Sequence, residues 1–401
     1  MTKTSADTQI QYLRSNNFLR TWTERECSIC EIEGVTLSSD RAPPEVAHRP
    51  TALIADRSDK EVPARPGKGP QDPYLNTFNA TVRAADAASN FSAWLKNPLP
   101  APKPRPAPVP PINNTKKVPP FDIQDVPKAM RKLNMPISAK LQERWFAGQA
   151  NYSRSHKDLQ AEIDQFGKRY DPSMVDTTTV TMAWALNFTR AKSAYDVLLK
   201  DEIRNPAALK GLRTLLAPYK TALTVDAWKL AGADFLKFHR EFQFQRMDVN
   251  KSWGDRISSF LIRSLSARGV PDDLTGALGA FNFYAAVQYA RIEPSKAGPV
   301  GVVTHFSIYV RDPYEVSDEQ YLGHWSVAHV AVVPAHQLAG GGGWLNYPVA
   351  EGNVYARDSV LYPVTNKDYR DWRNRHNQGG DFMIYTDRMS VRIDPPIRVR
   401  L

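Results

Sequence analysis

Apolar residues recur every three or four positions through residues 121–269, the spacing that puts side chains on one helix face. The pattern predicts helices over 122–132, 179–200, 226–243 and 251–268, a helix that Ser138 caps, and a stripe of Leu159, Ile163 and Phe166. Residues 179–200 are apolar around most of the predicted helix, which is typical of the centre of a bundle. Large aromatics at this spacing are typical of a core, so we expect burial of Trp145, Trp184, Trp228 and Trp253. Residues 121–269 are therefore predicted to form a helical domain.

The period changes to two after residue 270, where apolar and polar positions alternate. Alternation indicates strands with one buried face. It is clearest in two runs: Phe281, Phe283, Ala285, Val287 and Tyr289, then Val302, Thr304, Phe306, Ile308 and Val310. Shorter strands are predicted over 327–333 and 382–386, and a broken one over 391–399. Residues 270–401 are therefore predicted to form a mainly antiparallel, β-rich domain, as a sheet or a partial barrel, and the chain is predicted to be α+β.

Residues 1–120 lack such periodicity over most of their length and are rich in proline. Proline fixes φ and removes a backbone donor, so residues 97–112 are predicted to be an extended polyproline-II spacer. Short helices are predicted over 8–17 and 74–95. The remainder cannot bury enough apolar surface to offset chain entropy. We therefore predict a mostly disordered N-terminal arm that contains a proline-rich linker.

Composition narrows the class of protein. The chain has 401 residues, of which 42% are hydrophobic, and a mean hydropathy of −0.46. No apolar run reaches the roughly 18 residues of a membrane span, and the N-terminus has no apolar signal-peptide core. We therefore expect a chain made in the cytoplasm without a transmembrane segment, and export that cleaves no signal peptide stays open. The net charge of +10 favours anionic partners, but it is dispersed and no nucleic-acid motif is present, which argues against nucleic acid.

The two cysteines, Cys27 and Cys30, have CxxC spacing. Zinc prefers four ligands, and near the pair only His48 could add one. The polar flanks do not match a thioredoxin-like redox motif. Three interpretations stay open: an incidental pair, a metal half-site completed by a partner chain, and a disulfide formed outside the cytosol.

Titratable residues gather between two predicted strands near the C-terminus, in a polar segment of the kind that often carries a site. The cluster combines acidic residues and a histidine with three arginines: Asp368, Asp371, His376 and Asp381 with Arg370, Arg373 and Arg375. Carboxylates and histidine can supply acid–base catalysis or hold a divalent metal such as Mg²⁺. Arginines can bind a phosphate-bearing substrate. This hypothesis competes with a solvated helix turn in which Asp371 pairs with Arg375 at i,i+4.

A second candidate cluster consists of histidines: His324, His329 and His336, with His305 earlier in the chain. His324 and His329 lie five positions apart, so on one strand they would face opposite sides. A shared metal needs a turn between them, which the segment around Gly323 could supply. Separate, half-buried histidines are the alternative.

Several short blocks of the chain resemble one protein family. They are Val126-Pro127-Lys128-Ala129-Met130-Arg131-Lys132-Leu133, Arg144-Trp145-Phe146-Ala147-Gly148, Phe281-Asn282-Phe283-Tyr284, Tyr321-Leu322-Gly323-His324-Trp325, Asn346-Tyr347-Pro348-Val349, Asn366-Lys367-Asp368-Tyr369-Arg370 and Gly379-Gly380-Asp381-Phe382. Together they resemble the DUF6402 family of proteobacterial proteins, over about residues 121–401. Members of that family are commonly met near type VI secretion genes, and the resemblance brings no established activity.

The resemblance implies a bacterial protein connected with type VI secretion. The first expectation is an antibacterial effector whose Asp368–Asp381 cluster hydrolyses an anionic, phosphate-bearing substrate, and which has a cognate immunity protein. The alternative is a non-enzymatic adaptor or structural accessory protein of the secretion apparatus. In either case we expect the N-terminal arm to bind a component of the secretion machine or a chaperone.

Overall fold

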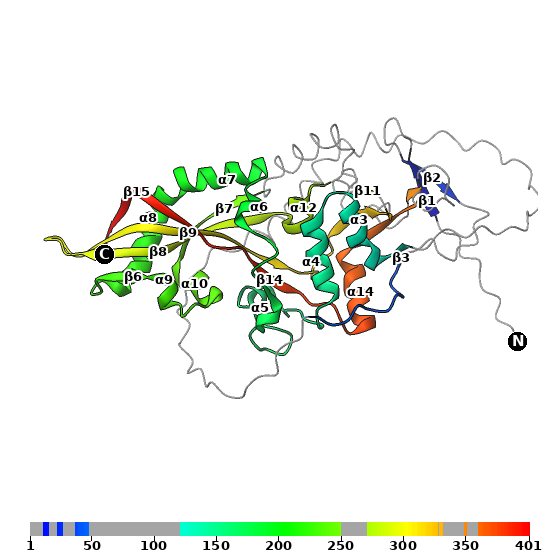
Figure 1. Cartoon of the computed structure of the whole chain (residues 1–401), viewed down its shortest axis with the longest axis horizontal. Helices are drawn as coiled ribbons and strands as arrows, with labels where there is room; N and C mark the ends of the chain where they lie inside the picture. The colour runs from blue at the N-terminus through cyan, green and yellow to red at the C-terminus, as the bar shows by residue number, and fades with distance from the viewer. Residues whose placement is uncertain are drawn as a thin grey trace, which may run out of the picture. The chain divides into compact units, whose positions relative to one another are not determined.

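The computed structural model describes residues 37–47, 121–249, 271–327, 329–331 and 360–401, and the backbone of strands at 11–15, 22–26 and 349–350 (Figure 1). Where the predicted helix at 8–17 overlaps this description, Gln11–Ser15 is instead a strand. Most of the predicted arm lies outside the described residues. So do the polyproline segment 97–112, the predicted helices at 74–95 and 251–268, Trp253, Cys27, Cys30 and His336.

The chain divides into two compact units. The larger contains the described parts of 41–51, 126–319 and 366–401, and the smaller contains those of 1–40, 52–125 and 320–365. Helices dominate up to residue 242 and mostly antiparallel strands follow, so the α+β prediction is confirmed. The predicted boundary near residue 269 does not coincide with this division, because the helices and the long strands share the larger unit.

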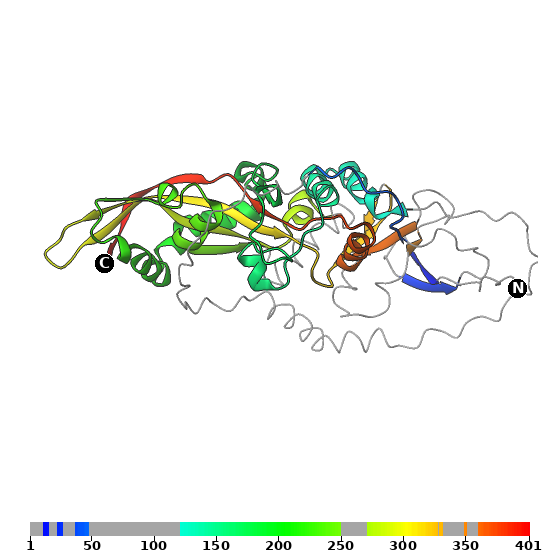
Figure 2. The ribbon, with the colours of Figure 1, turned by 90° about the horizontal axis from the view of Figure 1, so that it is seen from below.

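One sheet forms the centre of the larger unit, with strand order β5-β14-β9-β8-β6, while β15 also pairs with β9 and β7 with β8. Only β5 and β14 pair in parallel. The bounds are β5 Val175–Asp176, β6 Thr224–Asp226, β7 Gln243–Val249, β8 Phe281–Glu293, β9 Val300–Tyr314, β14 Phe382–Tyr385 and β15 Met389–Arg400. Figure 2 shows the long β8–β9 hairpin from a second side. The break predicted within 391–399 is present as a register shift in the β15–β9 pairing between Arg392 and Ile397.

Alternation along β9 gives the sheet two different faces. Phe306, Ile308 and Val310 share one face with Phe283 of β8, whose ring contacts Tyr195 of α7 (Thr189–Lys200). Tyr309 lies on the opposite face, where its ring packs on Phe238 of α10 (Phe235–Phe242). The core of this unit therefore lies on both sides of the sheet.

The other helices of the described chain are short. They are η1 Ile123–Asp125, α3 Val126–Lys132, α4 Pro136–Phe146, α5 His156–Gln160, η2 Pro172–Met174, α6 Met182–Ala185, η3 Glu202–Arg204, α8 Pro206–Leu216, η4 Ala217–Tyr219, α9 Ala227–Leu230, α12 Asp273–Leu278 and α14 Asn366–His376. No helix within the described ranges combines the length and apolar character that a membrane crossing requires.

Two sequence predictions about the first helices are wrong. Ser138 does not cap α4, because Pro136 occupies the first turn and Met135 is the N-cap residue; proline is preset for that position and needs no hydrogen-bond acceptor there. Ser138 instead donates its hydroxyl to Asp273 Oδ1 at 2.7 Å. The stripe of Leu159, Ile163 and Phe166 is not helical, because α5 ends at Gln160 and Phe166 is exposed.

Two long predicted helices are each broken in two. Residues 179–200 form α6 and α7, and 226–243 form α9 and α10. Between α9 and α10 the chain turns through Gly232 and Ala233, whose φ values of 66° and 62° are incompatible with a continuous helix. Trp145 is fully buried as predicted, whereas Trp184 and Trp228, which lie within the short helices α6 and α9, are half-buried.

The smaller unit contains a six-stranded sheet of order β11-β10-β13-β12-β1-β2 and the two-stranded pair β3-β4. The bounds are β1 Gln11–Ser15, β2 Trp22–Glu26, β3 Leu37–Ser38, β4 Phe121–Asp122, β10 Tyr321–Trp325, β11 Val330–Ala331, β12 Val349–Ala350 and β13 Val360–Thr365. Leu37 pairs with Phe121, and Ser38 donates its hydroxyl to Asp122 at 3.0 Å.

Residues 41–47 belong to the larger unit and are hydrogen-bonded to it. The amide N–H of Ala47 donates to the carbonyl of Ala147 at 2.9 Å. The side-chain amide of Gln378 donates to the carbonyl of Pro44 at 2.8 Å. A segment before residue 121 is thus attached to the body of the protein.

Candidate functional site

The predicted C-terminal cluster lies on α14 and the segment that follows it. Asp371 is exposed and forms an i,i+4 ion pair with Lys367. This is the surface arrangement that the sequence left open, with Lys367 as the partner instead of Arg375. Asp368 is half-buried and Arg375 is exposed. His376 is half-buried, with its ring centroid 4.8 Å from that of Trp372.

Asp381 and Arg373 are the predicted site residues that the fold brings together. Arg373 Nη1 donates to Asp381 Oδ1 at 2.9 Å, and the indole N–H of Trp145 donates to the same oxygen at 2.9 Å. All three side chains are buried. Loss of hydration raises the pKa of Asp381, and the charge of Arg373 and the hydrogen bond from Trp145 partly oppose that rise. The pair ties the end of α14 to α4.

Arg370 has a different set of partners. Its Nη1 donates to the carbonyl of Val316 at 2.8 Å and also to the carbonyl of Asp318, and its Nη2 pairs with Glu319. These bonds fix the segment after β9. A phosphate group at Arg370 would have to displace them.

The predicted histidine cluster is not formed by the described histidines, each of which bonds to a different neighbouring residue. His324 is buried and its Nδ1 is bonded to the hydroxyl of Tyr321. The backbone of His329 bonds with Ser326, and His305 Nδ1 lies 3.0 Å from the hydroxyl of Thr304. Within the described chain, no group of three His, Cys, Asp or Glu residues is arranged to hold a metal ion.

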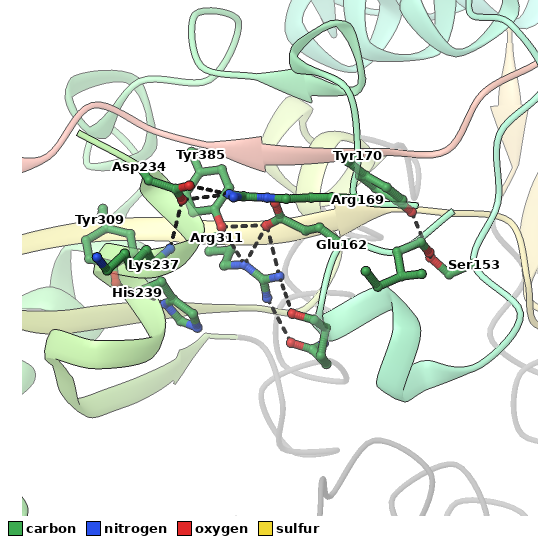
Figure 3. Close-up of polar contacts among 12 residues, drawn as sticks. Ser153, Glu162, Arg169, Tyr170, Asp234, Lys237, His239, Tyr309, Arg311 and Tyr385 are labelled. Atoms are coloured by element: carbon green, nitrogen blue, oxygen red, sulfur yellow. Dashed lines mark hydrogen bonds and ion pairs between the residues drawn. The ribbon is translucent and has the colours of Figure 1, made fainter. Parts of the chain in front are cut away.

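A buried polar cluster that the sequence analysis did not identify surrounds Arg311 of β9 (Figure 3). Its Nη1 and Nη2 donate to the side-chain oxygen and the carbonyl of Gln160, at 2.8 and 2.9 Å. Nη2 also donates to Glu162 Oε1 at 3.1 Å, and Nε donates to the hydroxyl of Tyr385 at 2.9 Å. The Tyr385 hydroxyl donates a hydrogen bond to the same Glu162 oxygen at 2.6 Å. We call these four residues the Arg311 cluster.

The Arg311 cluster holds one residue in an unfavourable backbone conformation. Glu162 has a φ of 56°, which non-glycine residues adopt rarely and at some cost in free energy. Its carboxylate accepts hydrogen bonds from Arg311 and Tyr385, two side chains of the sheet. The cluster therefore anchors the chain after α5 to β9 and β14.

His239 of α10 lies on the same sheet face as the Arg311 cluster, and Figure 3 shows it beside Tyr309. Its Nδ1 is 3.0 Å from the Tyr309 hydroxyl. Burial, followed by the charges of Arg311 and Arg240, holds the pKa of His239 well below its usual value. The imidazole is therefore neutral at physiological pH, and its role here is that of a hydrogen-bond partner.

Two further carboxyls, Asp312 and Glu315, follow Arg311 at the end of β9. Loss of hydration, and then the charge of Glu315, raise the pKa of Asp312 well above its usual value. Loss of hydration likewise raises the pKa of Glu315. Carboxyls with raised pKa values can act as proton donors near neutral pH. The sequence signal was the pair of adjacent charged residues Arg311 and Asp312, directly after the alternating residues 302–310.

No curated protein and no solved structure matches the chain. The model of the family described as "Family of unknown function (DUF6402)" matches residues 121–401. This range contains α14, the Arg311 cluster and the whole of β8 and β9. The chain belongs to the DUF6402 family.

Proposed function

We propose that this protein is a non-enzymatic binding component, an adaptor or structural accessory protein, of a type VI secretion apparatus. The connection with secretion comes from the resemblance of its sequence blocks to proteins met near such genes. The binding class is supported by one observation above all: the predicted catalytic carboxylates Asp371 and Asp381 are each engaged by a basic side chain of the fold. Their partners are Lys367 on the surface and Arg373 in the interior.

Expression of the full chain in a bacterial host tests this proposal. The chain is produced in the cytoplasm and, in a second strain, with a cleavable signal peptide that sends it to the periplasm. A binding component leaves growth unchanged in both strains. Growth arrest that disappears in His376→Ala and Asp371→Asn variants would overturn the proposal and identify the α14 cluster as a catalytic site.

The second candidate function is the antibacterial effector, with an immunity protein as its partner and an anionic substrate, with or without Mg²⁺. The observation that favours it is that two neighbouring carboxyls at the end of β9, Asp312 and Glu315, have raised pKa values, because a raised pKa favours the protonated form that a general acid needs. In the same growth assay, arrest that Asp312→Asn or Glu315→Gln relieves would support this function. Asp312→Asn and Glu315→Gln are tested beside His376→Ala and Asp371→Asn. The assay therefore also distinguishes a site at the end of β9 from a site on α14.

A further inference from the structure

A turn between α5 and β5 carries an exposed aromatic side chain. Phe166 is 72% exposed, and Tyr152 is 44% exposed. Burying an aromatic side chain in an interface is one of the largest single contributions to binding. Both side chains are exposed in this unit, whose aromatic residues otherwise form much of the core.

The turn that presents Phe166 is held by hydrogen bonds around Asp164, which is buried. Asp164 Oδ1 accepts from the amide N–H groups of Phe166 and Lys168, at 2.9 and 2.8 Å. The amide N–H of Asp164 donates to the carbonyl of Lys168 at 2.7 Å, and Gly167 takes a φ of 78°. Such a turn is already ordered, so a partner that binds Phe166 avoids much of the entropy cost of ordering a loop.

Tyr152 is attached to the same turn. Gln165 accepts a hydrogen bond from the amide N–H of Tyr152 at 3.1 Å and donates to the carbonyl of Ala150 at 3.0 Å. The hydroxyl of Ser153 donates to the carbonyl of Ile163 at 2.7 Å. The guanidinium of Arg373 lies 5.2 Å from the centre of the Tyr152 ring. Residues 150–153 and 163–168 therefore form one surface, which the Arg311 cluster anchors to the sheet through Gln160 and Glu162.

The acidic and basic side chains of this segment differ in their surroundings. Each acidic side chain bonds to the protein itself: Asp158 to Ser155, Glu162 to Arg311, Asp164 to the turn, and Asp171 to the amide of Ser173. The basic side chains are exposed, and they are Arg154, Lys157, Lys168 and Arg169. Glu162 is neutralised by Arg311 and Arg169 by Asp234. The remaining acidic residues of 150–169, Asp158 and Asp164, are half-buried and buried, whereas Arg154, Lys157 and Lys168 are exposed. The exposed charged side chains of this segment are therefore basic.

From these observations we infer that residues 150–169 are a docking surface for an acidic protein segment that carries an apolar side chain. The apolar side chain covers Phe166 and Tyr152, and the acidic residues face Arg154, Lys157 and Lys168. Charge complementarity of this kind sets partner choice and association rate. The inference rests on the proposed binding function and adds to it the place of binding and the chemical class of the partner.

A peptide array tests the inference with the full chain. The peptides place one Leu, Phe or Trp among increasing numbers of Asp and Glu, and a matched series uses Lys and Arg instead. We expect the acidic series to bind and the basic series not to bind, with affinity that falls as ionic strength rises. We expect Phe166→Ser to weaken binding of the best acidic peptide by about tenfold or more, as for a central interface residue. Lys168→Glu should weaken it as well.

Leu223→Ser is the control variant, because Leu223 is 85% exposed and lies outside this segment, in the turn before β6. It should bind the acidic peptide as the unchanged chain does. Equal binding of the acidic and basic series, or equal loss in Phe166→Ser and Leu223→Ser, would overturn the inference. The growth assay measures neither quantity, so a failure of this inference is distinguishable from a failure of the proposed function.

Discussion

Arg311 Nη2 lies 3.1 Å from Glu162 Oε1, and both side chains are almost completely removed from solvent. One residue comes from the centre of the sheet and the other from the chain after α5. Glu162 also accepts a hydrogen bond from the Tyr385 hydroxyl. This buried ion pair therefore attaches the segment that presents Phe166 to the sheet.

Breaking this ion pair on one side should strongly destabilise the larger unit. Arg311→Met leaves the carboxylate of Glu162 buried without a counter-charge, which typically costs about 3–5 kcal/mol. The free energy of unfolding from a urea titration measures the loss. Arg169→Met is the control: Arg169 pairs with Asp234 at 2.6 Å on the surface, and exposed pairs contribute about 1 kcal/mol or less. Similar losses in the two variants would show that the buried pair has no special role.

Gly379 should not tolerate a side chain. Its φ is 100°, and an added Cβ would lie 2.6 Å from the ring of Trp145, which is fully buried. Gly379→Ala combines backbone strain with overpacking and should cost more than about 2 kcal/mol. Gly167→Ala has a similar φ of 78° but nothing within 4 Å of the new Cβ, so only the strain of about 1–2 kcal/mol should remain. Thermal unfolding of the two variants side by side gives the difference, and a larger loss in Gly167→Ala would contradict the packing described here.

Asp312 should make stability depend on pH with a defined sign. Its pKa is raised in the folded protein, so the folded state keeps a proton that the unfolded chain loses above about pH 3.9. At low pH the carboxyl of Asp312 is protonated in both states and does not reduce the stability of the fold. As pH rises, the unfolded state loses the proton more easily, so the folded state becomes less stable relative to it. We expect Asp312→Asn to raise the melting temperature near neutral pH and to change it little below about pH 4.

Asp176 provides a control of opposite sign. Burial raises its pKa, but hydrogen bonds from Thr179 and Thr178 and the charge of Arg144 outweigh this effect and leave the pKa lowered. Its stabilising effect is present at neutral pH and disappears on acidification. Asp176→Asn should therefore lower the melting temperature near neutral pH and have less effect in acid. If both variants shift the melting temperature in the same direction near pH 7, these protonation states are wrong.

The two carboxylates Asp371 and Asp381 of the predicted cluster should differ in their effect on stability. Asp381→Ala removes an acceptor of both Trp145 and Arg373 and leaves the buried guanidinium without a counter-charge, at a cost of about 3 kcal/mol or more. Asp371→Ala removes an exposed i,i+4 pair and should cost less than about 0.5 kcal/mol. Denaturant midpoints of the two variants measure this. A large loss in Asp371→Ala would mean that Asp371 has a buried role that its exposure does not indicate.

The strands were more predictable from the sequence than the helices. β8 and β9 alternate because each presents one face to α7 and the other to the Arg311 side, so their period is visible in the residues themselves. Residues 179–200 carry a continuous apolar pattern, yet the chain breaks after α6. Thr181, which accepts a hydrogen bond from the Trp184 amide, marks the start of α6. The second helix, α7, begins after Phe188, which makes no side-chain capping bond, so the sequence carried no capping signal at the break. Asn205 and Pro206 gave such a signal for α8, which no prediction covered.

The partners of the candidate site residues could not be predicted from spacing. Asp371 has a basic residue four positions before it and another four positions after it, and helical geometry alone does not choose between Lys367 and Arg375. Asp381 bonds to Trp145, which lies 236 residues away along the chain. Such a pair becomes visible only when the fold places α4 beside the end of α14. The same is true of Glu162, whose partner Arg311 lies on the central strand.

Residues 37–47 are attached to the fold, although they lie before the region that the family model matches. The residues that the fold uses therefore extend beyond that region. A fragment cut at residue 121 would leave the Phe121 strand without Leu37 beside it, and the amide of Gln378 without the carbonyl of Pro44. After proteolytic cleavage between residues 48 and 120, we therefore expect the short N-terminal piece to copurify with the body as a noncovalent complex, detectable by native mass spectrometry. In this protein, a segment outside the shared family sequence completes the fold of the part inside it.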